Sequence, residues 1–427
     1  MKINPIRGTH DLFGEELKKF NKVVYEVKDK AKKFGFNELI TPIFESSELF
    51  KKPLGEQSDV VLKEMYTFKD RNEDEITLRP EYTTPMIRAA ISNGLLNNLP
   101  AKFFGTGQMF RRERPQKGRY RQFNQINFEN FGTDDIFSDI EIINLANTIL
   151  KNILPHRKIT LHLNTLGSRE NLKDYKNTLS KYFNDNKNLL SADSVNKINA
   201  NPLRILDSKN IEDKDIIEKC PKLIESLSKS DLNLYEEIKN CLIDLNITTY
   251  EDPKLVRGLD YYCHTVFEFK TDDIGSQDTL IGGGRYNGLI QALGGKNLPG
   301  VGWAGGIERI MLLMEDIVSN EKNIHLAIQD PTYKKYALAM YDFLIKNNFG
   351  VYWNYKYNLK KSLSLASDKK AQYIIIVGEL ENTNNKYALK NLISGEQKIV
   401  DLKNILDHIK WLILKNNLII LSQNSKK

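Results

Sequence analysis

The stretch from Phe110 to Gly132, FRRERPQKGRYRQFNQINFENFG, limits the possible folds most, because it reads as a basic turn followed by an unusual strand. Side chains alternate between the two faces of a strand. One face here carries Phe123, Gln125, Asn127, Glu129 and Phe131. A half-buried strand normally hides an apolar row. A polar row between two aromatic rings therefore predicts a lined pocket.

The turn before this strand is strongly basic. Its cationic residues are Arg111, Arg112, Arg114, Lys117, Arg119 and Arg121. Pro115 and Gly118 favour a fixed turn conformation. Arginine forks bind phosphate oxygens in pairs, so the turn predicts a polyphosphate site. A solvated basic turn on an edge hairpin is the alternative interpretation.

Length and composition indicate a folded protein of several domains. The 427 residues allow two or three domains, and 41% hydrophobic with 27% charged residues argues against disorder. No apolar run reaches the length of a membrane span, and the sequence MKINPIRGTH has no apolar signal region. We therefore expect a cytoplasmic protein without a membrane partner.

The cysteine and histidine pattern gives no sign of a metal site. Cys220, Cys241 and Cys263 are widely spaced and odd in number, which favours reduced thiols. The six histidines show no HxxxH or HExxH spacing. We expect no structural zinc and no dedicated metal ligands.

The positive charge is concentrated in the last hundred residues. From His325 onward the chain has 16 Lys and no Arg against 8 acidic residues, whereas the whole chain has a net charge of +7. This asymmetry favours a tail domain that meets a polyanion such as tRNA, rRNA or DNA. A basic surface that only aids solubility is the alternative.

Periodicity predicts the main elements. Glu15–Phe34 is patterned as an amphipathic helix that Gly35 ends. Phe36–Phe44 is patterned as a strand with Pro42 inside it, which indicates an edge strand or a dimer interface. From Gly167 to about Tyr250 the composition changes to a mostly helical insert, either a spacer or a contact for a large substrate.

Two further segments carry candidate site residues. Glu81 and Thr83 share a face before a helix that Thr84 would cap, so they either bind an ammonium group or serve the cap. Arg257 follows a strand entry beside Gly258, where it either enters a cavity or pairs with Asp260.

Glycine-rich segments at 282–285 and 300–306 precede helices. They allow close approach to an anion, but match neither GxGxxG nor GxxxxGK[ST]. The tail alternates strands and helices, which predicts a small mixed α/β domain.

In this order the segments resemble the class II aminoacyl-tRNA synthetases, and the histidyl-tRNA synthetase family in particular. The first motif ends near Pro42, the FRxE strand and its loop form the second, and GGIER forms the third. LVRGLDYY (255–262), GGGRYNGL (282–289) and TLRPE (77–81) are similar to segments specific to the histidine enzymes.

The resemblance implies an α/β (α+β) fold. A class II antiparallel-sheet catalytic domain would span residues 1–324, with the mostly helical insert at about 167–250. A mixed α/β anticodon-binding domain would span 325–427. A homodimer is implied as well.

The implied reaction has two steps. Histidine and ATP give histidyl-adenylate and pyrophosphate, and the histidyl group then passes to the terminal adenosine of tRNA(His), releasing AMP. Arg111 and Arg257 are the implied catalytic residues at the α-phosphate. Mg²⁺ is expected with the nucleotide.

The resemblance also assigns the substrate contacts. Implied ATP contacts are Arg111, Glu113, Arg119, Phe123 and Arg309. Implied histidine contacts are Glu81, Thr83, Gln125, Glu129, Tyr261, Tyr262 and Tyr286. Gln116 and Arg121 are the implied contacts to the acceptor end of tRNA.

Glu129 and Tyr262 would read the two imidazole nitrogens. A substrate lacking those nitrogens would leave buried polar groups unpaired, a penalty of about 10⁴-fold or more in rate.

Three residues depart from the family pattern, and three other functions are alternatives to the implied one. Tyr82 stands where the family often has glycine, Asn287 where it often has aspartate, and Asn127 where a small residue is frequent. The main rival is the inactive paralogue that acts as a regulatory subunit in histidine biosynthesis, which the arginines and the basic tail argue against. A class II synthetase for another amino acid and a bare RNA-binding protein are weaker rivals.

Overall fold

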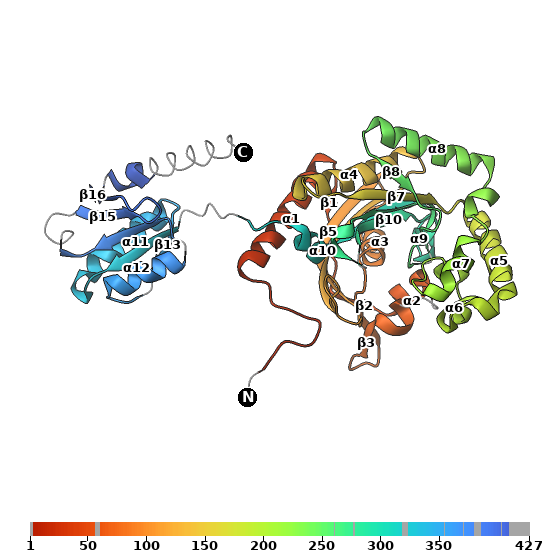
Figure 1. Ribbon diagram of the computed structural model, residues 1–427, viewed down its shortest axis with the longest axis horizontal. Coiled ribbons are helices and arrows are strands. Elements are labelled where there is room, and N and C mark those ends of the chain that lie inside the picture. The colour runs from red at the N-terminus through yellow and green to blue at the C-terminus, as the bar shows by residue number, and fades with distance from the viewer. Residues whose placement is uncertain are drawn as a thin grey trace. The chain divides into compact units, whose positions relative to one another are not determined.

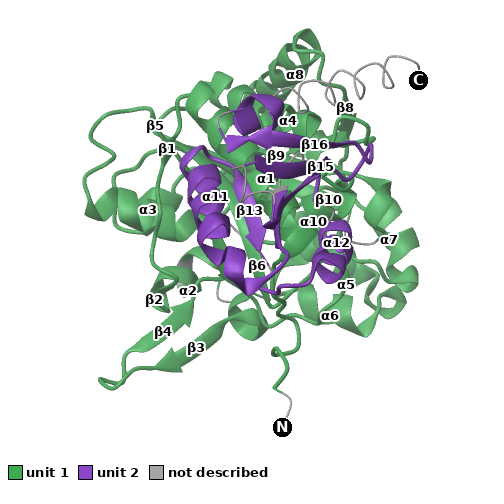
Figure 2. Ribbon diagram, turned by 90° about the vertical axis from the view of Figure 1, so that its left-hand side faces the viewer, with its two compact units in different colours: residues 1–317 green, residues 318–427 purple. Residues whose placement is uncertain are grey.

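The computed structural model describes residues 3–55, 60–259, 261–275, 278–317, 323–353, 355–369, 371–379, 386–402 and 404–409. The chain forms two compact units, residues 1–317 and 318–427, which Figure 2 colours separately. Each unit has its own sheet and its own hydrophobic core (Figure 1). Within the described ranges, none of the helices is long and apolar enough to cross a membrane.

The first unit is built on an eight-stranded sheet. In spatial order its strands are β1 (Asn37–Glu38), β5 (Ala101–Phe110), β6 (Gln122–Phe131), β11 (Gly300–Gly306), β10 (Thr279–Arg285), β9 (Cys263–Lys270), β7 (Thr160–Thr165) and β8 (Thr249–Glu251). The pairs from β5 to β7 are antiparallel, and only the outer pairs β1–β5 and β7–β8 are parallel. The predicted fold class, with an antiparallel central sheet, is therefore confirmed.

Helices cover one face of this sheet and leave the polar row of β6 on the other. The covering helices are α1 (Gly14–Lys33), α4 (Phe137–Ile153), α8 (Lys229–Asp244) and α10 (Ile307–Leu313). Ile126 and Phe128 of β6 pack into this core, whereas Phe131 belongs to the core on the opposite side. The predicted alternation of β6 is thus confirmed, and its Gln125 and Glu129 face the second side.

The segment around Pro42 differs from the expected single strand. It is divided into β1, in the large sheet, and β2 (Phe44–Ser46), in a separate three-stranded sheet with β4 (Glu75–Leu78) and β3 (Tyr66–Lys69). Proline has no N–H to donate to a ladder, so the chain changes sheets where Pro42 lies. The predicted helix before it is confirmed, and Gly35 follows it with a φ of 76°.

Short helices lie on the second side of the sheet. They are α2 (Glu48–Leu54), the π-helical turn Val60–Glu64, α3 (Thr83–Ser92) and α9 (Leu289–Ala292). Between β7 and β8 the chain is helical, with α5 (Arg169–Asp185), α6 (Ala192–Lys197), α7 (Lys214–Glu218) and α8 joined by short 3₁₀ turns. Much of this helical segment shares one hydrophobic core with α2 and α3, so it is packed onto the second side.

The second unit is a five-stranded sheet with two described flanking helices. Its strands in spatial order are β13 (Gly350–Trp353), β12 (Asn323–Ile328), β14 (Tyr373–Val377), β15 (Lys386–Asn391) and β16 (Gln397–Asp401). The pairs β13–β12 and β12–β14 are parallel, and the pairs β14–β15 and β15–β16 are antiparallel. The helices are α11 (Lys334–Lys346) and α12 (Leu359–Asp368). The sequence predicts a last helix over Leu402–Trp411; of these residues, 402 and 404–409 are helical, and 403 and 410–411 lie outside the described residues.

Candidate active site

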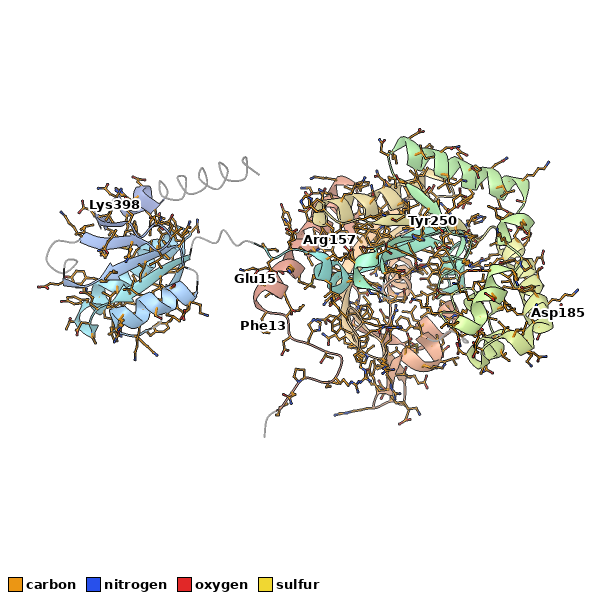
Figure 3. All side chains as sticks on the ribbon, viewed as in Figure 1. Phe13, Glu15, Arg157, Asp185, Tyr250 and Lys398 are labelled. Atoms are coloured by element: carbon orange, nitrogen blue, oxygen red, sulfur yellow. The ribbon has the colours of Figure 1, made fainter. Side chains whose placement is uncertain are left out.

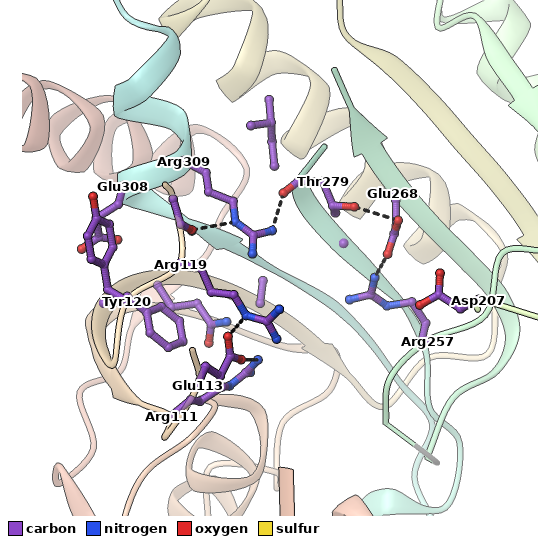
Figure 4. A pocket seen from close by; sticks show the side chains of 17 residues that line it. Arg111, Glu113, Arg119, Tyr120, Asp207, Arg257, Glu268, Thr279, Glu308 and Arg309 are labelled. Atoms are coloured by element: carbon purple, nitrogen blue, oxygen red, sulfur yellow. Dashed lines mark hydrogen bonds and ion pairs between the residues drawn. The ribbon is translucent and has the colours of Figure 1, made fainter. Parts of the chain in front are cut away.

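A cavity of about 380 Å³ opens on the second side of the large sheet. Its walls come from β6, β9, β10, β11 and the loop between β5 and β6 (Figure 4). The predicted site residues that line it are Arg111, Glu113, Arg119, Phe123, Gln125, Arg257 and Arg309. The structure therefore brings the whole predicted ATP set together with Arg257 and one predicted histidine contact.

The basic loop is divided between the cavity and the solvent. Arg111 and Arg119 line the cavity, whereas Arg112, Arg114 and Lys117 are exposed. The guanidinium of Arg111 lies over the Phe123 ring, 5.5 Å from its centroid, and its Nε donates to the Pro80 carbonyl at 2.8 Å. Burial lowers the pKa of Arg111. This loop is consequently more than a solvated turn, because part of its charge is held inside the protein.

Gln116 and Arg121, the predicted contacts to tRNA, are not among the residues that line the cavity. Arg119 is ion-paired with Glu113. Gln116 is exposed and exchanges backbone hydrogen bonds of 2.9 and 3.1 Å with Arg119. The backbone N–H of Arg121 donates to Gly8 O at 2.7 Å, and its Nε donates to Glu113 O at 3.3 Å. The N-terminal segment thereby fastens the base of this loop.

Arg309 closes the cavity from the side of α10. Its Nε donates to Gly118 O at 3.1 Å and its Nη1 to Thr279 O at 2.8 Å. Burial, together with the smaller effect of the charges of Arg111 and Arg119, lowers the pKa of Arg309 to about 10. Three cations face one cavity, which favours an anionic ligand.

Arg257 lies across the cavity from these three cations (Figure 4). Its guanidinium pairs with Glu268 and lies 5.6 Å from the centroid of the Tyr262 ring. Of its two predicted alternatives, the cavity position is the one observed; Asp260 lies outside the described residues.

A buried polar network lies beyond the Gln125 end of the cavity. Glu129 is 1% exposed, and its carboxylate accepts hydrogen bonds from the Thr83 hydroxyl at 2.6 Å, from the Asn127 amide and from the Tyr286 hydroxyl. Burial raises the pKa of Glu129 to about 8, against the opposing effect of these donors. Gln125 Oε1 is buried without a hydrogen-bond partner among the described residues, and so offers a free acceptor at the cavity wall.

Glu81 serves the start of α3 and also borders the network. Its carboxylate accepts from the backbone N–H groups of Thr83 at 2.7 Å and Thr84 at 2.9 Å, and from the Thr84 hydroxyl. The helix begins at Thr83, so the expectation that Thr84 caps it is wrong, and Glu81 satisfies those N–H groups instead. Burial raises the pKa of Glu81 as well.

Three tyrosines complete this network. The rings of Tyr261 and Tyr262 have centroids 4.6 Å apart, and that of Tyr286 lies 5.6 Å from Tyr261 and 6.4 Å from Tyr262. All three are buried. The structure therefore places every predicted histidine contact in one continuous region, with Gln125 at its border with the cavity.

The departures from the family pattern have local explanations. Tyr82 is fully buried, donates to Leu39 O at 3.3 Å, and occupies space that a side chain at Gly105 would fill. Asn287 lies away from the main cavity, where its amide donates to Asp134 at 3.3 Å. Asn127 alone contacts a predicted site residue, since it donates to Glu129.

Sequence reasoning missed several cavity residues. Glu268 alternates with Phe267 and Phe269 on β9, and this period-two signal could have identified it. Asp207 comes from the helical segment and has no local sequence signal. Glu308, at the start of α10, accepts from the Asn124 backbone N–H at 2.9 Å and from its amide at 2.8 Å.

The described residues show no dedicated metal cage. No group of three or more His, Cys, Asp or Glu among them could hold a metal ion. Of the four carboxylates that line the cavity, two are engaged by cations, Glu113 by Arg119 and Glu268 by Arg257, and Glu308 accepts hydrogen bonds from Asn124. A cation that enters this cavity would therefore depend mainly on ligands that its substrate brings.

Known proteins match nearly the whole chain. The family model described as histidyl-tRNA synthetase matches residues 8–310, and that of an anticodon binding domain matches 317–412. A histidine–tRNA ligase of Wolbachia pipientis wMel is 42% identical over 95% of this chain and 98% of its own length. One from Rhodospirillum rubrum is 42% identical over 94% and 97%.

Solved structures agree with these matches. The crystal structure of apo histidyl-tRNA synthetase from S. aureus has a TM-score of 0.79 and 31% identity, and covers 96% of this chain and 100% of that one. A protein from Bacillus halodurans, described as an ATP phosphoribosyltransferase regulatory subunit/histidyl-tRNA synthetase, has a TM-score of 0.63 at 16% identity and shares the fold.

Proposed function

This chain belongs to the histidyl-tRNA synthetase family, and from that premise we propose how its residues carry out the reaction. The chain is a ligase that activates histidine with ATP and transfers it to tRNA. The roles are assigned mainly because two parts of the site lie side by side. A cavity with four inward-facing arginines adjoins a buried network centred on the Glu129 carboxylate.

ATP occupies the cavity in this proposal. Arg111 and Arg257 flank the α-phosphate and stabilise the charge that develops as the histidine carboxylate attacks it. The cavity supports this role because Arg111 and Arg257 line it together. Phe123 and Arg309 sandwich the adenine ring, the latter through a cation–π contact. Arg119 reaches the distal phosphates, and Glu113 holds the adenine amino group or a cation.

Histidine occupies the region of the buried network. Its ammonium group is taken by Glu81, Thr83 and the free oxygen of Gln125, which are all buried. Glu129 and Tyr262 bind the two imidazole nitrogens, while Tyr261 and Tyr286 line the pocket. Glu129 already accepts hydrogen bonds from hydroxyl and amide donors, so its site is suited to another N–H donor.

Mg²⁺ enters with ATP and is held chiefly by the phosphates, since Mg²⁺ commonly uses few protein ligands at nucleotide sites. Among the predicted ATP contacts, Glu113 is the carboxylate proposed as a ligand of this cation. The acceptor end of tRNA(His) meets Gln116 and Arg121, of which Gln116 is exposed. The second unit binds the anticodon, and its excess of lysine supports that contact.

A homodimer is the proposed assembly, acting in the cytoplasm. Apolar side chains are exposed on the first-motif segment: Phe13 is 75% exposed, Ile40 73% and Phe44 59% (Figure 3 labels Phe13). Exposed apolar residues that form one contiguous patch mark an interaction surface, which is the role proposed for these three. A second copy of the chain fits this chemistry. The domain division proposed from the sequence, 1–324 and 325–427, differs from the division into compact units at 317/318 and would cut through β12 (Asn323–Ile328).

ATP–pyrophosphate exchange, with each standard amino acid added in turn, tests the proposal. Exchange with histidine alone is the expected result. Exchange with another amino acid would overturn Glu129 and Tyr262 as imidazole readers. Histidine binding without any exchange would bring back the regulatory paralogue, although the retained Arg111, Arg257 and Arg309 argue against it.

Arg257→Ala tests the catalytic assignment. Its contact should strengthen only in the transition state, so kcat for exchange should fall far more than histidine affinity. Equal losses in both would contradict the role.

A further inference from the structure

We infer that Glu268 is a positioning residue that holds the guanidinium of Arg257 in its working orientation. This inference rests on the proposed role of Arg257 and adds a residue to which neither sequence motifs nor the comparisons give a role. Figure 4 shows the Glu268 carboxylate between Arg257 and Thr279 at one side of the cavity.

The contacts of Glu268 make it a fixed anchor. One carboxylate oxygen pairs with Nη1 of Arg257. The other accepts the Thr279 hydroxyl at 2.9 Å and lies 3.2 Å from Nζ of Lys270. Both oxygens are therefore engaged, and the side chain is only 13% exposed. A carboxylate held in this way has little freedom to rotate, and it transfers that restriction to its arginine partner.

Arg257 itself needs such an anchor. Its Nε is buried without a hydrogen-bond partner among the described residues, so no contact at that atom fixes the plane of the guanidinium. The Tyr262 ring covers one side at 5.6 Å, and an added Cβ at Gly282 would lie 2.5 to 2.8 Å from the guanidinium atoms. The Tyr262 side chain also interacts with the guanidinium, but the ion pair with Glu268 is the charged contact that orients its N–H vectors.

The consequence for catalysis follows from geometry. If Glu268 holds one edge of the guanidinium, the opposite edge can point toward a phosphate in the cavity. Losing the anchor should displace Arg257, and a displacement of about 1 Å can cost about 100-fold in rate. Histidine binding should change little, because Glu268 lies at the ATP end of the site, away from Glu129.

The experiment is a double-mutant cycle on the full chain, measured by histidine-dependent ATP–pyrophosphate exchange. Glu268→Gln should lower kcat by about 10- to 100-fold and change the histidine KM less than about 3-fold. In an Arg257→Ala background, Glu268→Gln should cause no further loss. Glu251→Gln is the matched control, because Glu251 pairs with Lys239 at 3.0 Å on the edge strand β8 and should leave kcat unchanged.

The outcomes separate the inference from the proposed function. If Arg257→Ala leaves kcat unchanged, the role of Arg257 falls. If Arg257→Ala lowers kcat but Glu268→Gln has its full effect in that background, only the positioning role of Glu268 is overturned. A raised Mg²⁺ requirement in Glu268→Gln that persists without Arg257 would also overturn it, since Glu268 would then act on the metal. Thermal unfolding of each variant checks that the fold is intact.

Discussion

At the scale of single residues, the site depends on a carboxyl group kept in a costly place. Burial raises the pKa of Glu129 to about 8 from an ordinary value of 4.5. Between about pH 4.5 and pH 8, Glu129 therefore keeps a proton in the folded chain that it releases in the unfolded chain. The free energy of unfolding should therefore fall as pH rises from about 4.5 to about 8. A pKa perturbed this strongly by burial is common at functional sites.

The variant Glu129→Gln tests separately how Glu129 affects stability and how it affects histidine binding. At pH 9 the variant should unfold at a higher temperature than the wild type, because it carries no buried charge. Its histidine KM should rise by about 10-fold or more if Glu129 is the proposed acceptor for imidazole, since an amide replaces that carboxylate. Thermal unfolding and ATP–pyrophosphate exchange measure the two effects. An unchanged histidine KM would show that Glu129 is structural, and Glu251→Gln on β8 should alter neither quantity.

His325 is a second buried titratable residue, and it lies in the second unit. It is fully buried on β12, and neither ring nitrogen has a hydrogen-bond partner among the described residues. Burial lowers the pKa of His325 below its ordinary value of 6.5. The unfolded chain therefore takes up a proton more readily. Stability from this group is complete above about pH 6.5 and is lost as pH falls toward the lowered pKa.

His325→Leu should stabilise the second unit by about 1 to 3 kcal/mol, because it removes unsatisfied buried polar atoms. It should also weaken the loss of stability between pH 7.5 and 5.5. Urea unfolding followed by the fluorescence of Trp353, at both pH values, measures this. His408→Leu, at a half-buried position on the last described helix, is the control. An equal pH dependence in His325→Leu and wild type would contradict the assignment.

At the scale of elements, the glycines of β10 have different duties on the two faces of the strand. A Cβ at Gly282 would meet the flexible end of Arg257, 2.5 to 2.8 Å away. A Cβ at Gly283 would meet the backbone carbonyl of Gly302 and, at 2.7 Å, Cα of Trp303. A side-chain tip can move aside, whereas a paired backbone cannot.

The paired substitutions should consequently fail in different ways. Gly282→Ala should lower kcat for exchange by about 10-fold or more through displacement of Arg257, with little change in stability. Gly283→Ala should destabilise the fold by about 1 to 3 kcal/mol. Exchange kinetics and thermal unfolding, measured on both variants, provide the comparison. Equal losses of stability in the two would refute the division between the faces.

The same strands show what sequence could and could not predict. The period-two pattern of β6 placed Gln125 and Glu129 on one face and Ile126 on the other, because alternation is a local property of the backbone. The break at Pro42 was underestimated, since the pattern does not reveal that the two halves join different sheets. Asp207 could not be predicted as a cavity residue from the sequence, because its position depends on long-range packing of the helical segment.

At the scale of the whole molecule, charge and fold divide in the same way. The residues from His325 onward carry the basic excess, and the chain separates into compact units at 317/318. All the residues that line the candidate cavity belong to the first unit. We therefore expect the chemistry on histidine and ATP to depend on the first unit, and tRNA, a long polyanion, to be the ligand of the second.

Truncation after Ile317 should therefore separate the two half-reactions. Histidine-dependent ATP–pyrophosphate exchange should persist within about 10-fold of the full chain, because the transition-state contacts are retained. Charging of tRNA(His) should fall by a much larger factor, since the lysine-rich surface that neutralises phosphates is lost. Raising the salt concentration in the full chain should imitate the truncation for charging and spare exchange. Equal damage to both reactions on truncation would show instead that the second unit mainly supports the fold of the first.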